Sequence, residues 1–204
     1  MHNNYFYIDG SALLSDIKKQ TEVKAHLKGK KFNPIIFCKI FQGSQSLRKF
    51  HENAYNRIVF YFVKNDPRIK KLIKIPDFRV PGLIEDIEIK YCGKRIPIYK
   101  KAADWLEEKR APHYVTDSLY KSEKAVDTQI CCDAFFLLAL NKLDRLFLYS
   151  NDYDFIPLCG AIKTMGANIN LIRLTETRVN NDLVSVCDGF HSFTADQIDN
   201  FFEA

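Results

Sequence analysis

The sequence contains no long hydrophobic run, and this absence sets the first limit on its class. The longest apolar stretch runs from Ala134 to Leu140, far short of the roughly 20 residues that a membrane-spanning helix needs. The first residues, MHNNYFYID, show neither the basic start nor the cleavage site of a signal peptide. We therefore expect a cytoplasmic protein with no membrane partner.

Cysteine pairs at the spacing typical of zinc ligands are also missing. Six cysteines are scattered along the chain, and none of them forms a C-x-x-C pair. Structural zinc sites usually take ligands paired at such short spacing, so the pattern argues against structural zinc. Because free cysteine packs as a small apolar side chain, we predict buried, reduced thiols. Internal repeats and low-complexity segments are absent from the sequence as well.

What is present is typical of an ordinary globular protein: 204 residues, 47% hydrophobic and 27% charged. We predict one domain over residues 1–204, with an elaboration at about 64–113. The net charge of +5 divides into +11 over residues 1–124 and −6 over residues 125–204. This asymmetry favours a polyanion held near a cluster of carboxylates. The alternative is that most of these charges form a solvated surface.

Apolar runs and helical spacings alternate along the chain. They predict buried strands at 5–8, 57–63, 146–149 and 168–174, and a weaker strand at 35–41. They predict helices at 11–27, 44–55, 125–141 and 155–165, and a last helix opened by the capping box Thr194-x-x-Gln197. This alternation indicates a mostly parallel sheet covered on both faces.

The elaboration is less regular. Pro67 opens a short basic helix. The segments 87–91 and 95–99 flank Cys92-Gly93-Lys94 and are interpreted as a hairpin, and 101–110 as an exposed helix.

Acidic residues follow the predicted strands. Asp9 comes directly after the first strand, and Asp152 and Asp154 come directly after the strand at 146–149. Asp127 lies at the start of a long predicted helix. In a parallel sheet the carboxyl ends of the strands meet at one edge. Carboxylates gathered there repel one another, and a bound Mg²⁺ or Mn²⁺ would relieve that repulsion.

Each acid also has a simpler interpretation. Asp154 precedes a helix and could be its N-cap. Asp152 sits at the strand end and is harder to explain as a cap. Asp9 with Gly10 could form an ordinary turn, and Asp127 could be a first-turn acid that favours the helix dipole.

Three patterns together resemble the NYN family, whose members are PIN-like domains related to the 5′-nuclease superfamily. They are IDGS at residues 8–11, KAVDTQICCD at 124–133 and SNDYDFIPL at 150–158, the last being the most specific. Their order and spacing fit the family, and the resemblance covers roughly residues 3–63 and 114–192.

The resemblance implies a three-layer α/β/α PIN-like fold with a central, mostly parallel sheet. It also implies a ribonuclease that hydrolyses RNA phosphodiester bonds endonucleolytically with Mg²⁺ or Mn²⁺. The implied catalytic and metal-binding residues are Asp9, Asp127, Asp152 and Asp154. Asp133 matches a further family acid, but it lies six residues after Asp127 and therefore on another face of the helix. We expect Asp133 to hold neighbouring residues of the site in place or to have a structural role, and not to bind the metal directly.

The expected partner is RNA, single-stranded or structured. The chain could also form a homodimer. Candidate contacts to substrate are Ser11, Lys124, Ser150 and Asn151. Candidate backbone tracks are the basic residues Lys28, Lys30, Lys31, Arg68, Lys70, Lys71 and Lys74. Tyr99 or Trp105 could stack on bases, although core packing is the simpler role for Trp105.

One residue departs from the family pattern. Ser11 stands where the family usually has Asn, two positions after the first Asp. This departure motivates an alternative function as a catalytically weak or inactive RNA-binding or regulatory module, but it removes no metal ligand, so we still favour activity. The same segment, D-G-S after a strand, faintly resembles acid-first phosphohydrolases, but those enzymes carry a second Asp where this chain has Ser11.

Overall fold

The computed structural model describes residues 2–43, 54–74, 87–95, 105, 108–110, 123–175 and 179–203. Most of the predicted helices at 44–55 and 101–110, and the second half of the predicted hairpin, lie outside these residues. Within the described ranges, no helix is long and apolar enough to cross a membrane.

The described strands form one large sheet in the order β5-β4-β3-β1-β6-β7-β8. Neighbouring strands from β4 to β8 are parallel, and only β5 at the edge runs antiparallel, against β4. The strands are β1 His2–Asp9, β3 Ala54–Lys64, β4 Ile87–Arg95, β5 Glu123–Lys124, β6 Arg145–Tyr149, β7 Asn168–Arg173 and β8 Gly189–Ser192. A small second sheet pairs β2 Lys31–Phe32 with β9 Phe202–Glu203.

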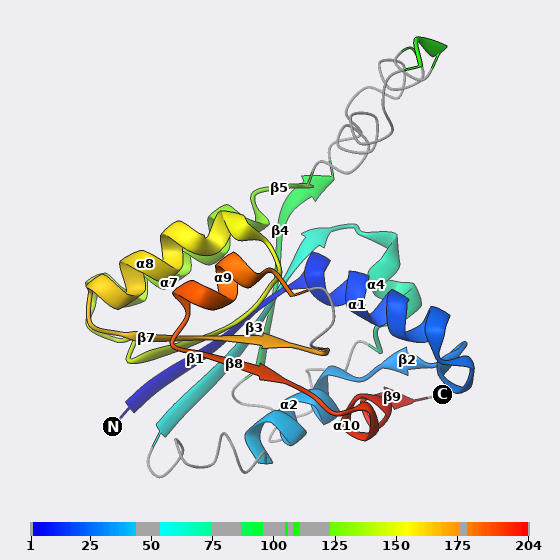
Figure 1. Ribbon diagram of the computed structural model, residues 1–204, viewed down its shortest axis with the longest axis horizontal. Helices are drawn as coiled ribbons and strands as arrows, with labels where there is room; N and C mark the ends of the chain where they lie inside the picture. Colours follow the sequence, from blue (N-terminus) through cyan, green and yellow to red (C-terminus); the bar gives the residue numbers. More distant parts are fainter. Residues whose placement is uncertain are drawn as a thin grey trace.

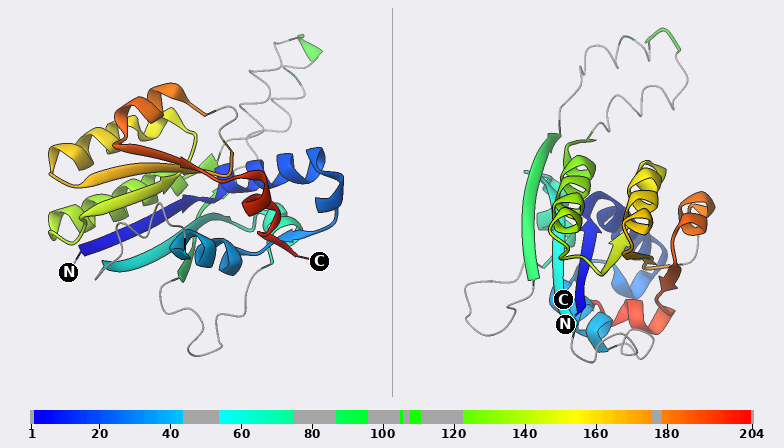
Figure 2. Two further views of the ribbon diagram at one scale, coloured as in Figure 1. Left: turned by 60° about the horizontal axis from the view of Figure 1, so that its bottom comes forward. Right: turned by 90° about the vertical axis from the view of Figure 1, so that its left-hand side faces the viewer.

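Helices cover both faces of this sheet, which confirms the predicted three-layer PIN-like fold (Figures 1 and 2). One layer contains α1 Gly10–Val23, α2 Pro34–Gly43, α4 Pro67–Leu72 and α10 Ala195–Asp199. The other contains α7 Val126–Ala139, α8 Ile156–Thr164 and α9 Asn181–Val186. Apolar residues of β3 alternate between the two layers: Phe60 and Phe62 pack with the first layer, and Tyr61 and Val63 with the second.

The predicted strand at 35–41 is wrong, because this segment is helix α2. Asn33 accepts hydrogen bonds through Oδ1 from the backbone N–H of Ile35 (2.9 Å) and Ile36 (3.3 Å), and Pro34 occupies the first turn. An Asn cap followed by Pro is a strong helix start, and it outweighs the β preference of the isoleucines that follow.

The predicted hairpin at 87–99 is also wrong at its turn. Strand β4 continues through Cys92, Gly93 and Lys94, and Lys94 and Arg95 pair with β5. Gly93 has a positive φ of 68°, and the register with β3 shifts at this point. The glycine therefore makes a bulge rather than a hairpin turn.

The last third of the chain follows the prediction closely. The Thr194–Gln197 capping box is formed and opens α10, and Gly166, with a φ of 86°, follows the end of α8. Helix α9 and strand β8 in this part of the chain had no predicted counterpart.

The predicted helix at 11–27 is shorter in the structure. Helix α1 ends at Val23, and a separate 3₁₀ turn, Ala25–Leu27, follows it.

Candidate active site at the carboxyl edge of the sheet

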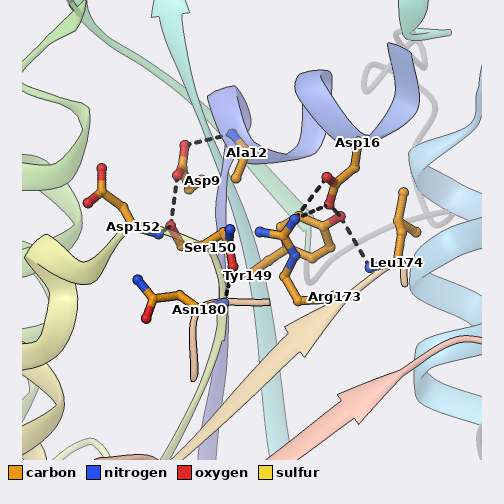
Figure 3. Close-up of polar contacts among 10 residues, drawn as sticks. Asp9, Ala12, Asp16, Tyr149, Ser150, Asp152, Arg173, Leu174 and Asn180 are labelled. Carbon is orange, nitrogen blue, oxygen red and sulfur yellow. Dashed lines mark hydrogen bonds and ion pairs between the residues drawn. The ribbon is translucent and has the colours of Figure 1, made fainter. Parts of the chain in front are cut away.

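Asp9 and Asp152 lie close together because β1 and β6 are adjacent and parallel. Asp9 is the last residue of β1, and Ser150 and Asp152 follow directly after β6. The Ser150 hydroxyl donates a hydrogen bond to Asp9 Oδ2 (2.9 Å), and its oxygen accepts one from the backbone N–H of Asp152 (3.2 Å). One buried hydroxyl thus joins the two strand ends, as Figure 3 shows.

Asp9 is held on both of its carboxylate oxygens. Its Oδ1 accepts from the backbone N–H of Ser11 (2.9 Å) and Ala12 (3.3 Å), so it is the N-cap of α1. Burial raises the pKa of Asp9, and the nearby Asp152 raises it further, while the hydrogen bonds from Ser150 and the two backbone groups act in the opposite direction. A buried carboxylate with a second one beside it favours a cation.

The structure corrects the assignment of the cap near Asp154. Tyr153–Phe155 form a 3₁₀ turn, η2, and Asp152 is its N-cap, because Asp152 Oδ1 accepts from the backbone N–H of Asp154 (3.0 Å). The helical path begins two residues earlier than the sequence suggests, since α8 starts at Ile156 directly after η2. Asp154 is therefore a first-turn residue with an exposed side chain.

Asp127 and Asp133 lie on α7, which follows β5. Because β5 pairs with the carboxyl end of β4, the first turn of α7 and Asp127 lie at the same edge as Asp9. Asp133 turns toward the sheet: it accepts hydrogen bonds from Tyr61 (2.8 Å), Lys90 (2.7 Å) and Gln129 (2.8 Å). Burial pushes the pKa of Asp133 upward, but these three hydrogen bonds outweigh burial and lower it.

The predicted substrate contacts have varied surroundings. Ser11 is half-buried, and its backbone N–H donates a hydrogen bond to Asp9. Ser150 is fully buried, so its hydroxyl faces Asp9 rather than solvent. Asn151 Oδ1 accepts from the backbone N–H of Asn180 (2.8 Å) and so ties the β6–η2 connection to α9. Lys124 is in β5, opposite Lys94.

Two residues of this neighbourhood have roles that the sequence did not predict. Asn180 caps α9 through its side chain, which accepts from the N–H groups of Asp182 and Leu183 (3.0 and 3.2 Å). An Asn followed two positions later by Asp is a helix-start signal that could have revealed it. Gly10 has no room for a side chain, because a Cβ there would lie 2.3 Å from Phe62 Cδ1. No local pattern reveals that contact.

The donor set determines which cation could be held here. No group of three or more His, Cys, Asp or Glu side chains is arranged to hold a metal ion in the described part of the chain. The predicted cluster of four carboxylates is therefore not preassembled. The pair Asp9 and Asp152 nevertheless fits Mg²⁺, which usually keeps several waters and takes one or two carboxylates together with substrate phosphates.

Comparisons with known proteins give a family for the chain and a structure of similar fold. The family model described as NYN domain matches residues 2–196. A crystal structure of a protein of unknown function from Vibrio parahaemolyticus superposes with a TM-score of 0.53 at 15% identity, over 99% of this chain and 96% of that one. At this identity the likeness shows the fold alone. No curated protein matches the chain.

Proposed function

Because the chain belongs to the NYN domain family, we propose that it is a metal-dependent ribonuclease, endonucleolytic, acting at the carboxyl edge of its sheet. The observation that carries the proposal is the joining of Asp9 and Asp152 through Ser150 at the ends of two adjacent parallel strands. This edge is where ligands bind in open α/β sheets.

Each acidic residue takes a role from its position. Asp9 and Asp152 would hold Mg²⁺ or Mn²⁺, and Ser150 would keep the Asp9 carboxylate in place. Asp127, at the start of α7, and Asp154, exposed on η2, would complete the acidic surface that faces the metal waters and the scissile phosphate. A bound metal supplies a water of lowered pKa and stabilises charge on the phosphate oxygens.

Four other predicted residues act as supports in this proposal. Ser150 and Asn151 shape the β6–η2 connection, and the Ser11 backbone holds Asp9. Asp133 fixes α7 against β3 and β4 through Tyr61 and Lys90, and so acts at a distance from the substrate.

The test is incubation with labelled structured and unstructured RNA and DNA in Mn²⁺, Mg²⁺ or EDTA. We expect wild type to cleave RNA with either metal and not with EDTA. Asp152→Asn keeps the shape of the side chain but removes its charge, so we expect it to lose cleavage while its circular dichroism spectrum stays native.

The matched control is Glu22→Gln, which neutralises an exposed acid at the far end of α1 and should leave cleavage unchanged. Cleavage by Asp152→Asn at the wild-type rate would rule out the proposed site. Salt-sensitive RNA binding that is indifferent to EDTA, without turnover, would instead favour the binding module suggested by Ser11.

A further inference from the structure

We propose that a pocket beside Tyr91 binds an unpaired base of the RNA strand that flanks the scissile phosphate. The inference rests on the proposed ribonuclease function and adds a subsite for single-stranded RNA to it. The pocket has a volume of about 290 Å³ and lies between the end of β3 and the start of α4. It is lined by Lys64, Asn65, Asp66, Ile69, Lys70 and Tyr91.

The pocket lies next to the candidate active site. Asp9 pairs with Tyr61 in the register of β1 and β3. Lys64 is three residues further along β3, which corresponds to about 10 Å at ~3.3 Å per residue. The pocket therefore lies beyond the same carboxyl edge of the sheet as Asp9, one strand away.

A continuous chain of contacts links the Tyr91 pocket to Asp9. The Tyr91 and Phe62 rings are 6.4 Å apart between centroids. Phe62 in turn packs so closely on Gly10 that a Cβ at Gly10 would overlap it. Gly10 is the residue after Asp9, so the pocket wall and the first carboxylate belong to one packed unit.

The chemistry of the lining suits a base and its phosphate. Tyr91 is 49% exposed although it is a large aromatic residue, and Ile69 adds a buried apolar surface beside it. Aromatic side chains next to cationic groups are the usual platform for unpaired bases, because every base has a face that can stack. Lys64 and Lys70 are exposed and would meet the backbone phosphates.

The acidic residue of the lining does not cancel this charge. Asp66 is buried and bound by Arg68, whose Nη2 is 2.6 Å and whose Nε is 3.0 Å from Asp66 Oδ2. Asp66 is therefore already paired with a cation of its own, and the two lysines keep their attraction for an anion.

A second cavity, of about 230 Å³, fits RNA less well. It lies over the middle of β1 and β3 rather than at their carboxyl ends, and its cations pair with neighbouring carboxylates, Arg57 with Glu88 and Lys90 with Asp133. Both its position and its charge favour the Tyr91 pocket as the RNA subsite.

The experiment measures RNA binding in EDTA by fluorescence anisotropy, with an unstructured oligonucleotide of about ten nucleotides. We expect Tyr91→Ala to weaken binding about tenfold and Tyr91→Phe to bind as wild type, because stacking needs the ring and not the hydroxyl. Removing Lys64 and Lys70 together should lower the slope of log affinity against log salt by about 0.7 for each lysine.

Matched controls come from the opposite side of the molecule. Phe136→Ala removes an aromatic residue that is 65% exposed on α7, and Lys142→Ala removes an exposed lysine after that helix. Both should bind RNA as wild type does. Thermal melts of all variants identify any loss of affinity that comes from unfolding.

An abasic scan of the oligonucleotide identifies the stacked base. One abasic position should weaken binding to wild type as much as Tyr91→Ala does, and the same position should have no further effect in Tyr91→Ala. Equal binding by Tyr91→Ala and wild type, or abasic effects that add fully to the substitution, would overturn the inference, as would wild type that binds no RNA.

The two proposals can fail separately. RNA cleavage that is unaffected by Asp152→Asn, together with a Tyr91-dependent abasic position, contradicts the active site and supports the subsite. Metal-dependent cleavage lost in Asp152→Asn, together with full RNA affinity in Tyr91→Ala, supports the active site and contradicts the subsite.

Discussion

At the scale of the residue, Gly10 shows how tightly the site is built into the fold. It begins α1 directly after Asp9, and its missing side chain lets the helix lie against the end of β3. An added Cβ would lie 2.3 Å from Phe62 Cδ1 and 2.4 Å from the backbone oxygen of Tyr61. Backbone cannot move aside as a flexible side chain can, so this glycine helps to determine where Asp9 lies.

We predict that Gly10→Ala lowers the free energy of unfolding by about 1–3 kcal/mol through overpacking. Gly160→Ala is the matched control, because Gly160 is in α8 and a Cβ there meets nothing within 4 Å. This control should stabilise the protein by about 0.5–1 kcal/mol. Urea denaturation measures the free energy of unfolding of both variants. Equal changes in Gly10→Ala and Gly160→Ala would contradict the steric argument.

At the scale of the element, a buried ion pair joins α1 to β7 behind the candidate site (Figure 3). Asp16 accepts from Arg173 Nη2 (2.8 Å to Oδ1) and from the Tyr149 hydroxyl (2.7 Å to Oδ2), and the hydroxyl accepts from the backbone N–H of Leu174 (3.3 Å). Arg173 is 3% exposed, and its Nε and Nη1 have no hydrogen-bond partner among the described residues. Asp16 is therefore the partner that makes the buried guanidinium tolerable.

We predict that Asp16→Asn lowers the free energy of unfolding by about 3–5 kcal/mol, because it leaves a buried positive charge without compensation. Tyr149→Phe removes a neutral hydroxyl that donates to Asp16 and accepts from Leu174, and should cost less, about 1–3 kcal/mol. The double variant Asp16→Leu with Arg173→Met should be more stable than Asp16→Asn, since replacing both charges removes the imbalance. Chemical denaturation measures the free energy of unfolding of the three variants. A double variant less stable than Asp16→Asn would contradict the argument that Asp16 compensates the buried charge of Arg173.

A second link between elements is sensitive to pH. Asp133 connects α7 to β3 and β4 through Tyr61 and Lys90, and its pKa in the folded protein lies below the ordinary 3.8. A carboxyl group with a lowered folded pKa stabilises the fold above its unfolded pKa. That stabilisation is lost as the pH falls through the folded pKa.

We therefore predict that Asp133→Asn lowers the free energy of unfolding by about 1–3 kcal/mol near neutral pH. The difference between wild type and variant should shrink as the pH falls below 3.8. Denaturation curves measured from neutral to acidic pH test this. A difference that stays constant across the series would show that the charge of Asp133 is not the cause.

At the scale of the whole molecule, acidic and basic character come from different parts of the chain. The net charge is +11 over residues 1–124 and −6 over residues 125–204. The fold brings one acid of the basic part, Asp9, next to Asp152 of the acidic part. A cation held by these two carboxylates would link β1 to β6, so its binding should be visible in the stability of the whole protein.

We predict that Mn²⁺ at about 100 times its dissociation constant adds about 2.7 kcal/mol to the free energy of unfolding. Asp152→Asn, which loses one of the two carboxylates, should show little of this gain, and EDTA should return wild type to its starting stability. Differential scanning calorimetry over a metal titration measures the effect. The same rise in Tm for both proteins would place the cation elsewhere.

The sequence alone determined the alternation of strands and helices and the placing of acids at strand ends. Apolar runs and caps are local signals, so β1, β3, β6, β7, α7, α8 and α10 could be predicted from them. Where two local signals compete, as with the Asn–Pro start of α2 and the glycine bulge of β4, the prediction fails.

Only the tertiary structure decided which residues meet. Ser150 reaches Asp9 across 141 positions of sequence and Arg173 reaches Asp16 across 157, because the strand order puts β6 beside β1 and β7 beside β6. The same order sets Tyr91 against Phe62 and Gly10. Strand order depends on how whole elements pack, and no short stretch of sequence contains that information.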